Sequence, residues 1–129
     1  MDCPECGAPM VAFDVPPAAG DAAPGDPAAI CTTCLALVEA DTADESPDFS
    51  SLIEAFPAGE TGAVMAVAVG LLVDSMVLNR ETIAALLEDV ADRGEDPWLV
   101  LERLHASQTI QSGTDIGRAR TQLEQLIDG

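Results

Sequence analysis

The chain has 129 residues, enough for one ordinary domain or for a small metal module joined to a modest helical unit. Hydrophobic residues make up 48% of it, which excludes wholesale disorder, and aromatic residues make up only 3%, so the core must be aliphatic. The formal charge is −18, from 23 acidic and 5 basic residues. The chain therefore lacks the cluster of basic residues that direct nucleic-acid binding requires.

All four cysteines fall into two C-x-x-C pairs, Cys3 with Cys6 and Cys31 with Cys34. Two such pairs are typical of a four-thiolate zinc site, because each short turn aims two sulfurs at one ion. Four thiolates leave no open coordination position, so we expect a structural zinc ion, not a catalytic one. Alternatives for these cysteines are a rubredoxin-like iron centre, a redox-active thiol pair and disulfides.

Residues 1–41 are predicted to form the metal module. Residues 10–15 and 35–38 are predicted as short strands, and residues 16–27 contain only Pro, Ala, Gly and Asp, which is typical of a flexible loop. Gly7 follows the first cysteine pair and supplies the left-handed backbone that such a turn tends to need, whereas Leu35 stands at the same place after the second pair. Two cysteine turns with short antiparallel strands resemble a zinc ribbon.

An acidic linker at residues 42–46 is predicted to separate this module from a helical bundle at residues 47–129. The hydrophobic period changes there from about two to 3.6, which predicts about five helices and an α+β fold for the whole chain. The helices are expected at residues 47–56, 60–78, 80–93, 97–106 and from about 115 onward. The second is apolar nearly all round and should lie at the centre of the bundle. In the last helix, the side chains expected to face the core are those of Ile116, Ala119, Leu123, Leu126 and Ile127.

Three single residues and a group of arginines have both a functional and a structural interpretation, and the structural one is favoured for each. His105, the only histidine, is a candidate base or metal ligand, or the boundary residue of a helix face. Asp74 interrupts the most apolar helix, either as a buried acid with a raised pKa or as its solvent-facing position. Trp98 is a candidate interface anchor or a core residue. A small basic spot and surface ion pairs are the two interpretations of Arg93, Arg103, Arg118 and Arg120, and ion pairs are expected.

The N-terminus shows no basic region followed by an apolar stretch. The longest apolar run, residues 63–73, is shorter than the ~20 residues that a membrane helix needs. We therefore expect a cytoplasmic protein without a membrane segment, whose thiols are reduced, and this favours metal over disulfides.

A chain with no lysine and this much acid resembles proteins of halophilic archaea, for which molar salt shortens the Debye length to ~3 Å and screens self-repulsion. The sequences CPECG at residues 3–7 and CTTC at residues 31–34 resemble those of small haloarchaeal proteins that join a CPxCG zinc knuckle to a helical tail and have no assigned activity. The resemblance implies structural zinc and a regulatory or adaptor role, and it transfers no catalytic residues.

These observations favour a non-enzymatic zinc-binding adaptor. Its helical unit would present an apolar groove or edge to a protein partner or to a second copy of the chain. The first alternative is an accessory factor of transcription or translation that contacts a nucleoprotein complex. The second alternative is a rubredoxin-like iron electron carrier.

Overall fold

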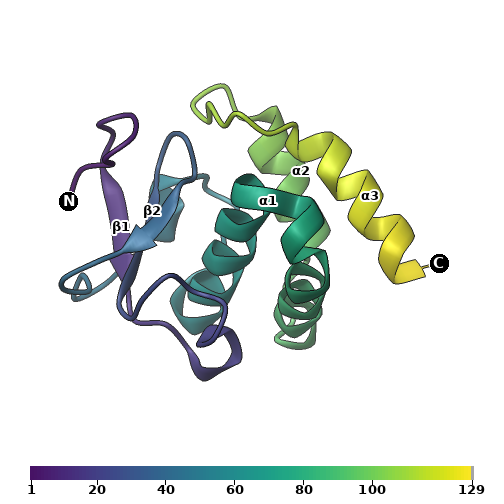
Figure 1. Cartoon of the computed structure of the whole chain (residues 1–129), viewed down its shortest axis with the longest axis horizontal. Helices are drawn as coiled ribbons and strands as arrows, with labels where there is room; N and C mark the ends of the chain where they lie inside the picture. The colour runs from purple at the N-terminus through teal and green to yellow at the C-terminus, as the bar shows by residue number, and fades with distance from the viewer. Residues whose placement is uncertain (129) are drawn as a thin grey trace.

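A computed structural model describes residues 1–128, and within them it has a three-stranded antiparallel sheet followed by three α-helices (Figure 1). The α+β prediction is therefore confirmed. The strands, adjacent in chain order, are β1 (Met10–Phe13), β2 (Ala28–Cys31) and β3 (Leu37–Glu39). The α-helices are α1 (Gly59–Asp92), α2 (Pro97–Ala106) and α3 (Ile116–Asp128). Two short 3-10 helices span Pro17–Ala19 and Phe49–Ser51.

The middle strand of the sheet, β2, is the strand that the sequence pattern did not predict. All four of its residues are buried, so its faces show no alternation between apolar and polar side chains, and two of them are alanines, which have low strand propensity. It pairs on both sides: its residue Cys31 lies opposite Met10 of β1, and its residue Ile30 lies opposite Leu37 of β3. Pairing with both neighbours, a non-local effect, makes this segment a strand.

The prediction of about five helices is wrong, because two of them are segments of α1. Helix α1 runs for 34 residues with one non-helical residue, Ser75, whose φ of −162° and ψ of 100° are extended. The second segment begins at Ser75, not at Asn79: the Ser75 hydroxyl accepts a hydrogen bond from the Leu78 amide at 3.3 Å. The Asn79 side-chain amide instead donates to the Leu71 carbonyl across the kink, at 3.3 Å.

The helix predicted at residues 47–56 is also absent as an α-helix from the described chain. Only the 3-10 turn Phe49–Ser51 forms there, and its N-cap is Asp48, which accepts a hydrogen bond from the Ser50 amide at 3.1 Å. The residue before a proline avoids the helical region, and Pro57 closes the segment after too few residues for a stable helix. Three of the four side chains on the predicted apolar face, Phe49, Leu52 and Phe56, are nevertheless buried, and the fourth, Ile53, is partly buried.

Both ends of the connection between α1 and α2 follow the predicted signals. Gly94 ends α1 with a φ of 94°, a left-handed conformation that favours glycine. The Asp96 carboxylate caps α2 by accepting hydrogen bonds from the amides of Trp98 and Leu99, at 3.1 and 3.2 Å, and Pro97 occupies the first turn. Helix boundaries set by such local chemistry are readable from sequence.

One hydrophobic core joins the sheet to the helices. The sheet lies against the first segment of α1, and α2 and α3 lie on the other side of that helix (Figure 1). Val11, Phe13 and Ile30 of the sheet belong to the same cluster of buried side chains as Leu101 of α2 and Leu123 of α3. Residues 62–70 of α1 are all buried, which confirms the predicted central position of this helix.

The inward face of α3 is shorter than predicted. Ile116, Ala119 and Leu123 are buried as expected. Leu126 is instead 43% exposed, and the predicted inward position of Ile127 lies outside the described side chains.

By length and composition alone, α1 is long and apolar enough to cross a membrane, with an 18-residue window of mean hydropathy 2.0. Core helices of globular proteins meet the same criterion, and 56% of this window is buried within the fold. Because α1 forms the centre of the hydrophobic core, its hydropathy is accounted for without a membrane.

Gly70→Ala is expected to destabilise the protein although alanine favours helices. A Cβ atom at Gly70 would overlap the Cβ atom of Leu37 in β3 and lie 2.9 Å from its Cδ2 atom. The gain in helix propensity is about 1 kcal/mol, whereas overpacking costs about 1–3 kcal/mol, so a net loss of about 1 kcal/mol is expected in denaturant unfolding. Gly113→Ala, where a Cβ meets no atom within 4 Å, should be neutral. Equal stability of the two variants would contradict close packing of α1 on β3.

Candidate metal centre

The two cysteine pairs lie at the same end of the sheet because of strand pairing. Cys31 is the last residue of β2, and the second pair occupies the turn that leads to β3. The first pair precedes β1 in a turn closed by hydrogen bonds from the Cys3 amide to the Ala8 carbonyl, at 2.8 Å, and from the Gly7 amide to the Cys3 carbonyl, at 2.9 Å. The Thr32 amide donates to the Pro9 carbonyl at 3.1 Å and ties the two turns together.

The four sulfur atoms all lie within 4.8 Å of one another. Cys3 Sγ lies 3.7 Å from Cys34 Sγ, and Cys6 Sγ lies 3.4 Å from Cys31 Sγ. Bonds of about 2.3 Å to a tetrahedral zinc ion place sulfurs about 3.8 Å apart, whereas a disulfide needs about 2.05 Å. The structure therefore brings all four predicted ligands together, and their separations fit one metal ion.

Backbone amides point at two of the sulfurs. The Glu5 amide donates to Cys3 Sγ, and the amides of Thr33 and Cys34 donate to Cys31 Sγ, each at 3.4 Å. Such hydrogen bonds favour the thiolate form, which is the form that binds metal. The local turns thus prepare the sulfurs for ligation as well as positioning them.

The thiols differ in how readily they ionise in the metal-free protein. Burial by itself raises the pKa of the Cys3 thiol, but hydrogen bonds from the amides of Cys6 and Glu5 outweigh it and lower the pKa to about 7. Burial raises the pKa of the Cys31 thiol, and it raises that of the Cys34 thiol to about 12. A metal ion that binds here must displace protons from Cys31 and Cys34.

Zinc affinity is expected to fall steeply on acidification. Between pH 7 and 9 the zinc ion displaces at least the two protons of Cys31 and Cys34, so affinity should fall at least about 100-fold per pH unit. Below pH 7 the Cys3 thiol is protonated too, and the fall should steepen to at least about 1000-fold per unit. Competition with a chromophoric chelator at constant ionic strength measures this slope. A loss of less than tenfold per unit would contradict binding by these thiolates.

Each cysteine pair is followed by a residue with left-handed backbone, Gly7 with a φ of 79° and Leu35 with a φ of 66°. The second turn therefore has the same left-handed backbone as the first, although it has leucine in place of glycine. The Leu35 side chain is fully buried in the main core. Burial of this side chain offsets the backbone strain at the position.

A cleft of about 600 Å³ lies between the cysteine turns and the helices. Glu5, Cys6 and Cys34 line it on one side, and Asp74 and Thr114 line it on the other. Asp74 is exposed, which supports its interpretation as the solvent-facing position of its helix. The cleft gives solvent access to the exposed Cys6 side chain.

The polar connection between α2 and α3 bridges this cleft, which sequence reasoning missed. The Gln111 amide donates to the Thr33 carbonyl in the second cysteine turn at 2.7 Å. The Thr114 hydroxyl donates to the Val73 carbonyl just before the kink of α1, at 3.1 Å. Both acceptors are backbone carbonyls of distant segments, which carry no residue-type signal, so only the structure reveals these contacts.

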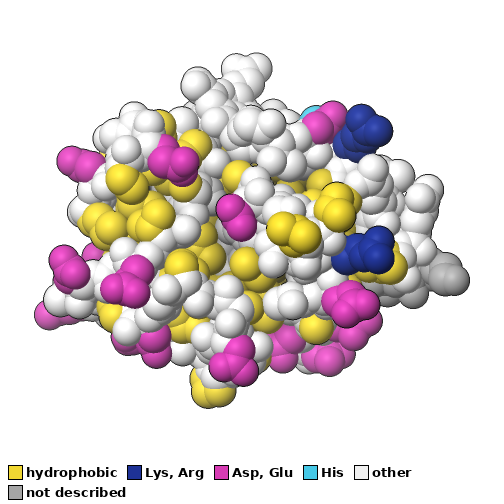
Figure 2. Space-filling model, viewed as in Figure 1, with side chains coloured by type: hydrophobic (Ala, Val, Ile, Leu, Met, Phe, Trp, Pro, Cys, Tyr) yellow, Lys and Arg dark blue, Asp and Glu magenta, His cyan; other side chains and the backbone are white. Residues whose placement is uncertain are grey.

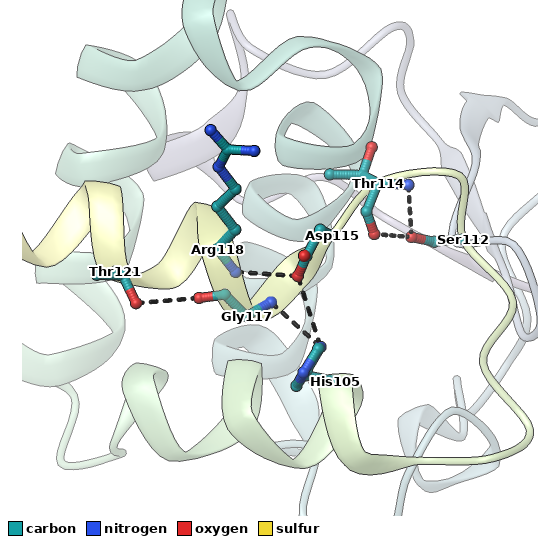
Figure 3. A network of polar contacts seen from close by, with 7 residues as sticks. All are labelled: His105, Ser112, Thr114, Asp115, Gly117, Arg118 and Thr121. Atoms are coloured by element: carbon teal, nitrogen blue, oxygen red, sulfur yellow. Dashed lines mark hydrogen bonds and ion pairs between the residues drawn. The ribbon is translucent and has the colours of Figure 1, made fainter.

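His105 lies at the end of α2 against the start of α3 (Figure 3). Its Nδ1 atom accepts a hydrogen bond from the Gly117 amide at 3.3 Å and lies 3.9 Å from an Asp115 oxygen. The nearby Ser112 hydroxyl donates to the Thr114 carbonyl, not to the imidazole. This arrangement supports the structural interpretation of His105, a residue at a helix end, over that of a general base.

Trp98 and two of the arginines make structural contacts. Trp98 is half-buried against the main core, and its carbonyl accepts a hydrogen bond from Arg120 Nε at 3.2 Å. Arg120 also pairs with Glu124 at 2.8 Å, and Arg93 pairs with Asp89 at 2.6 Å. Asp89 raises the pKa of the Arg93 guanidinium by this hydrogen bond. Among the described side chains, residues 1–126, Arg103 and Arg118 make no such ion pair, so the expectation is met for two of the four arginines.

Comparison with known proteins adds family membership to this geometry. No curated protein and no solved structure gives a significant match to the chain. Residues 2–127 match the family of unknown function DUF6276. The match includes both cysteine pairs and nearly all of the helical part. The chain therefore belongs to DUF6276, a family of unknown function.

Proposed function

We propose that this protein is a non-enzymatic, zinc-binding adaptor in which Cys3, Cys6, Cys31 and Cys34 hold a structural Zn²⁺. The observation that carries the proposal is the mutual approach of the four sulfurs within 4.8 Å. Four thiolates close the coordination sphere of zinc, so the ion supplies folding free energy and leaves no position for a reacting water. With two cysteine turns at one end of a short antiparallel sheet, the N-terminal part is best described as a zinc ribbon.

The binding role is supported by the surface of the helical part. Val77 and Leu78 are 70% and 85% exposed, next to a groove between α1 and α3. Exposed apolar side chains beside a groove are typical of protein-binding sites. The acid-rich, lysine-free composition supports a halophilic, cytoplasmic setting for the adaptor, in which salt screens the charge of −18.

Metal analysis tests the first half of the proposal. The purified protein is expected to hold one zinc ion per chain, and Cys31→Ser is expected to hold close to none. Thr33→Ser in the same turn, whose hydroxyl makes no hydrogen bond in the described structure, is the matched control and should keep its zinc. Iron with visible absorbance would contradict the proposal and support an electron carrier.

Recovery of a partner tests the second half. A tagged wild-type chain is expected to recover one protein at fixed stoichiometry from an extract at native salt, and Cys31→Ser is expected to lose it. Co-sedimentation with ribosomes or RNA polymerase would support the accessory factor instead. A chain that holds zinc, associates with no protein and stays monomeric would contradict an adaptor.

A further inference from the structure

The four cysteines of the metal centre differ in their access to solvent. Cys3 and Cys31 are buried, and Cys34 is partly buried. Cys6 is exposed, and it lines the cleft of about 600 Å³ between the cysteine turns and the helices. Reaction of a thiolate with a reagent in solution requires such access. The centre therefore presents one of its sulfurs to reagents on the wall of an open cleft.

Cys6 also lacks hydrogen bonds from the backbone. Amides donate hydrogen bonds to Cys3 Sγ and to Cys31 Sγ, each at 3.4 Å. Within residues 1–126, whose side chains the structure describes, no amide donates a hydrogen bond to Cys6 Sγ. Hydrogen bonds stabilise a thiolate and thereby lower its nucleophilicity. Exposure and the lack of these bonds thus both identify Cys6 as the most reactive sulfur of the centre.

The charges around the cleft favour an uncharged reagent. Glu5 and Asp74 line the cleft, and its lining contains no basic residue. A zinc ion held by four thiolates adds further negative charge. Figure 2 shows acidic side chains around the sheet, whereas the basic side chains of this face lie over the helical part. An anionic reagent is therefore repelled from the cleft, and a small neutral one is not.

Cys31 is placed to react with Cys6 but not with solvent. The two sulfurs lie 3.4 Å apart, within the range of about 3–3.5 Å at which reacting atoms are positioned for attack. Cys3 Sγ and Cys34 Sγ are farther apart, at 3.7 Å. Cys31 is buried, so a reagent in the cleft meets Cys6 first and Cys31 can react only in a second step.

We propose that Cys6 is the oxidation site of the metal centre, where a small neutral hydroperoxide reacts and Cys31 then forms a disulfide with Cys6, which releases the zinc ion. The Cys6 thiolate attacks one peroxide oxygen, the O–O bond breaks, and Cys6 becomes a sulfenic acid while hydroxide leaves. The Cys31 thiolate attacks the Cys6 sulfur, the S–O bond breaks, and a second hydroxide leaves. The two sulfurs lose two electrons in total, and the peroxide gains them.

The disulfide removes two of the four ligands at once, because only thiolates bind the metal. The change also acts on the second cysteine turn, where the Thr33 carbonyl accepts a hydrogen bond from the Gln111 amide at 2.7 Å. Gln111 belongs to the connection between α2 and α3, so oxidation at the sheet affects the helical part. The inference rests on the proposed zinc-binding function and adds its regulation by oxidants.

Peptide mapping after limited oxidation tests the pairing. The zinc-loaded chain is treated with one equivalent of hydrogen peroxide, the remaining thiols are alkylated, and the chain is cleaved after glutamate. This cleavage separates residues 1–5, which contain Cys3, from residues 6–39, which contain the other three cysteines. We expect residues 1–5 to be released with an alkylated thiol, residues 6–39 to hold a disulfide between Cys6 and Cys31, and zinc to be released in the same proportion.

Other disulfides give different products in this experiment. A bond between Cys3 and Cys6 would join the two peptides. A bond between Cys31 and Cys34 would lie within one fragment after further cleavage at the aspartates of residues 14–26, whereas the expected disulfide joins two fragments. Alkylation of Cys34 and not of Cys31 completes the assignment. Each of these other disulfides, as the main product, would overturn the inference.

Brief alkylation of the zinc-loaded chain with a neutral maleimide tests the reactivity of Cys6 directly. In the chain that carries a single label, we expect the label on Cys6 at least about ten times as often as on Cys3 or Cys31. Only the singly labelled chain is informative, because loss of one ligand weakens the binding of the metal by the others. A label found mainly on Cys3 or Cys31 would overturn the inference.

Two aromatic disulfides test the effect of charge: dithiodipyridine is neutral, and dithiobis(nitrobenzoate) is a dianion. Asp74→Asn should speed the reaction with the dianion at least about twofold in dilute salt, and less in molar salt, without changing the rate with the neutral reagent. Glu88→Gln is the matched control, because it removes an exposed acid that does not line the cleft, and it should have a smaller effect. Equal effects of the two variants would contradict reaction through the cleft.

The zinc content separates failure of this inference from failure of the proposed function. A chain that holds zinc, and whose thiols survive excess hydrogen peroxide, overturns the inference and leaves the zinc-binding function in place. A chain that holds no zinc as purified, yet forms the disulfide between Cys6 and Cys31 with peroxide, overturns the zinc-binding function and leaves the oxidation site in place.

Discussion

Removal of the proposed zinc ion is expected to destabilise the whole chain, not only the cysteine turns. Binding of a structural zinc ion to small domains supplies about 10–16 kcal/mol, as much as the total stability of an ordinary domain. The sheet that the cysteines hold together contributes Phe13 and Ile30 to the core that also contains Leu87 and Leu101. Loss of the sheet would therefore expose the central helix α1 to water.

Chelator titration, followed by far-UV circular dichroism and by the fluorescence of Trp98, measures this effect. Trp98 lies on α2, in the helical part of the molecule, so its signal reports whether unfolding reaches the far side of the core. We expect the helical signal, the fluorescence and the zinc release to change together. Cys31→Ser should resemble the chelated protein, and Thr33→Ser should resemble the wild type.

The opposite outcome, in which zinc removal leaves the helices folded, would be equally easy to identify. If the thiols become reactive while helix content and Trp98 fluorescence stay constant, the cysteine turns and the sheet form an independent module. That result would support the division at residues 42–46 that the composition of the chain predicts, and it would limit the role of the metal to residues 1–41.

Leu35→Gly is expected to be more stable than Leu35→Ala, the reverse of the usual order. Both variants lose a fully buried leucine side chain, at a cost of about 2–5 kcal/mol. Alanine keeps the left-handed backbone strain of this position, where φ is 66°, and glycine removes about 1–2 kcal/mol of it. Glycine elsewhere costs about 0.5–1 kcal/mol relative to alanine, so the net advantage of glycine here should be about 1 kcal/mol.

Denaturant unfolding of the zinc-loaded variants checks this order. Leu104 is the matched control, because it is as deeply buried but lies inside α2, and there Leu104→Gly should be less stable than Leu104→Ala. A glycine variant less stable than the alanine variant at position 35 would show that the second cysteine turn does not impose left-handed backbone.

Much of the candidate site could be predicted from local spacing. Two intervening residues are enough for a turn to aim both cysteines at one ion, and Gly7 identifies the conformation of the first turn. The same conformation in the second turn could not be predicted, because Leu35 occupies the position and its side chain is buried in the main core. The loop contact from Gln111 to Thr33 could not be predicted, since a backbone amide and a backbone carbonyl carry no residue identity.

The helices also have features that local sequence predicts and features that it does not. Asp96 with Pro97 and Arg93 with Gly94 mark helix ends by hydrogen bonds and backbone angles within a few residues, so their boundaries follow from sequence. The periodic apolar residues from 49 to 56 indicate burial correctly but not helix. An amphipathic period reports which side chains face a core, and Pro57 prevents the backbone there from completing a helix.

By itself, the sequence determined the α+β class, the four clustered cysteines, the aliphatic composition of the core and the ends of α2, because each depends on residue type and on neighbours a few positions away. Only the tertiary structure decided that β2 is a strand and that sheet and helices share one core. These features depend on contacts between residues far apart in the chain, where the free energy of packing outweighs local preference.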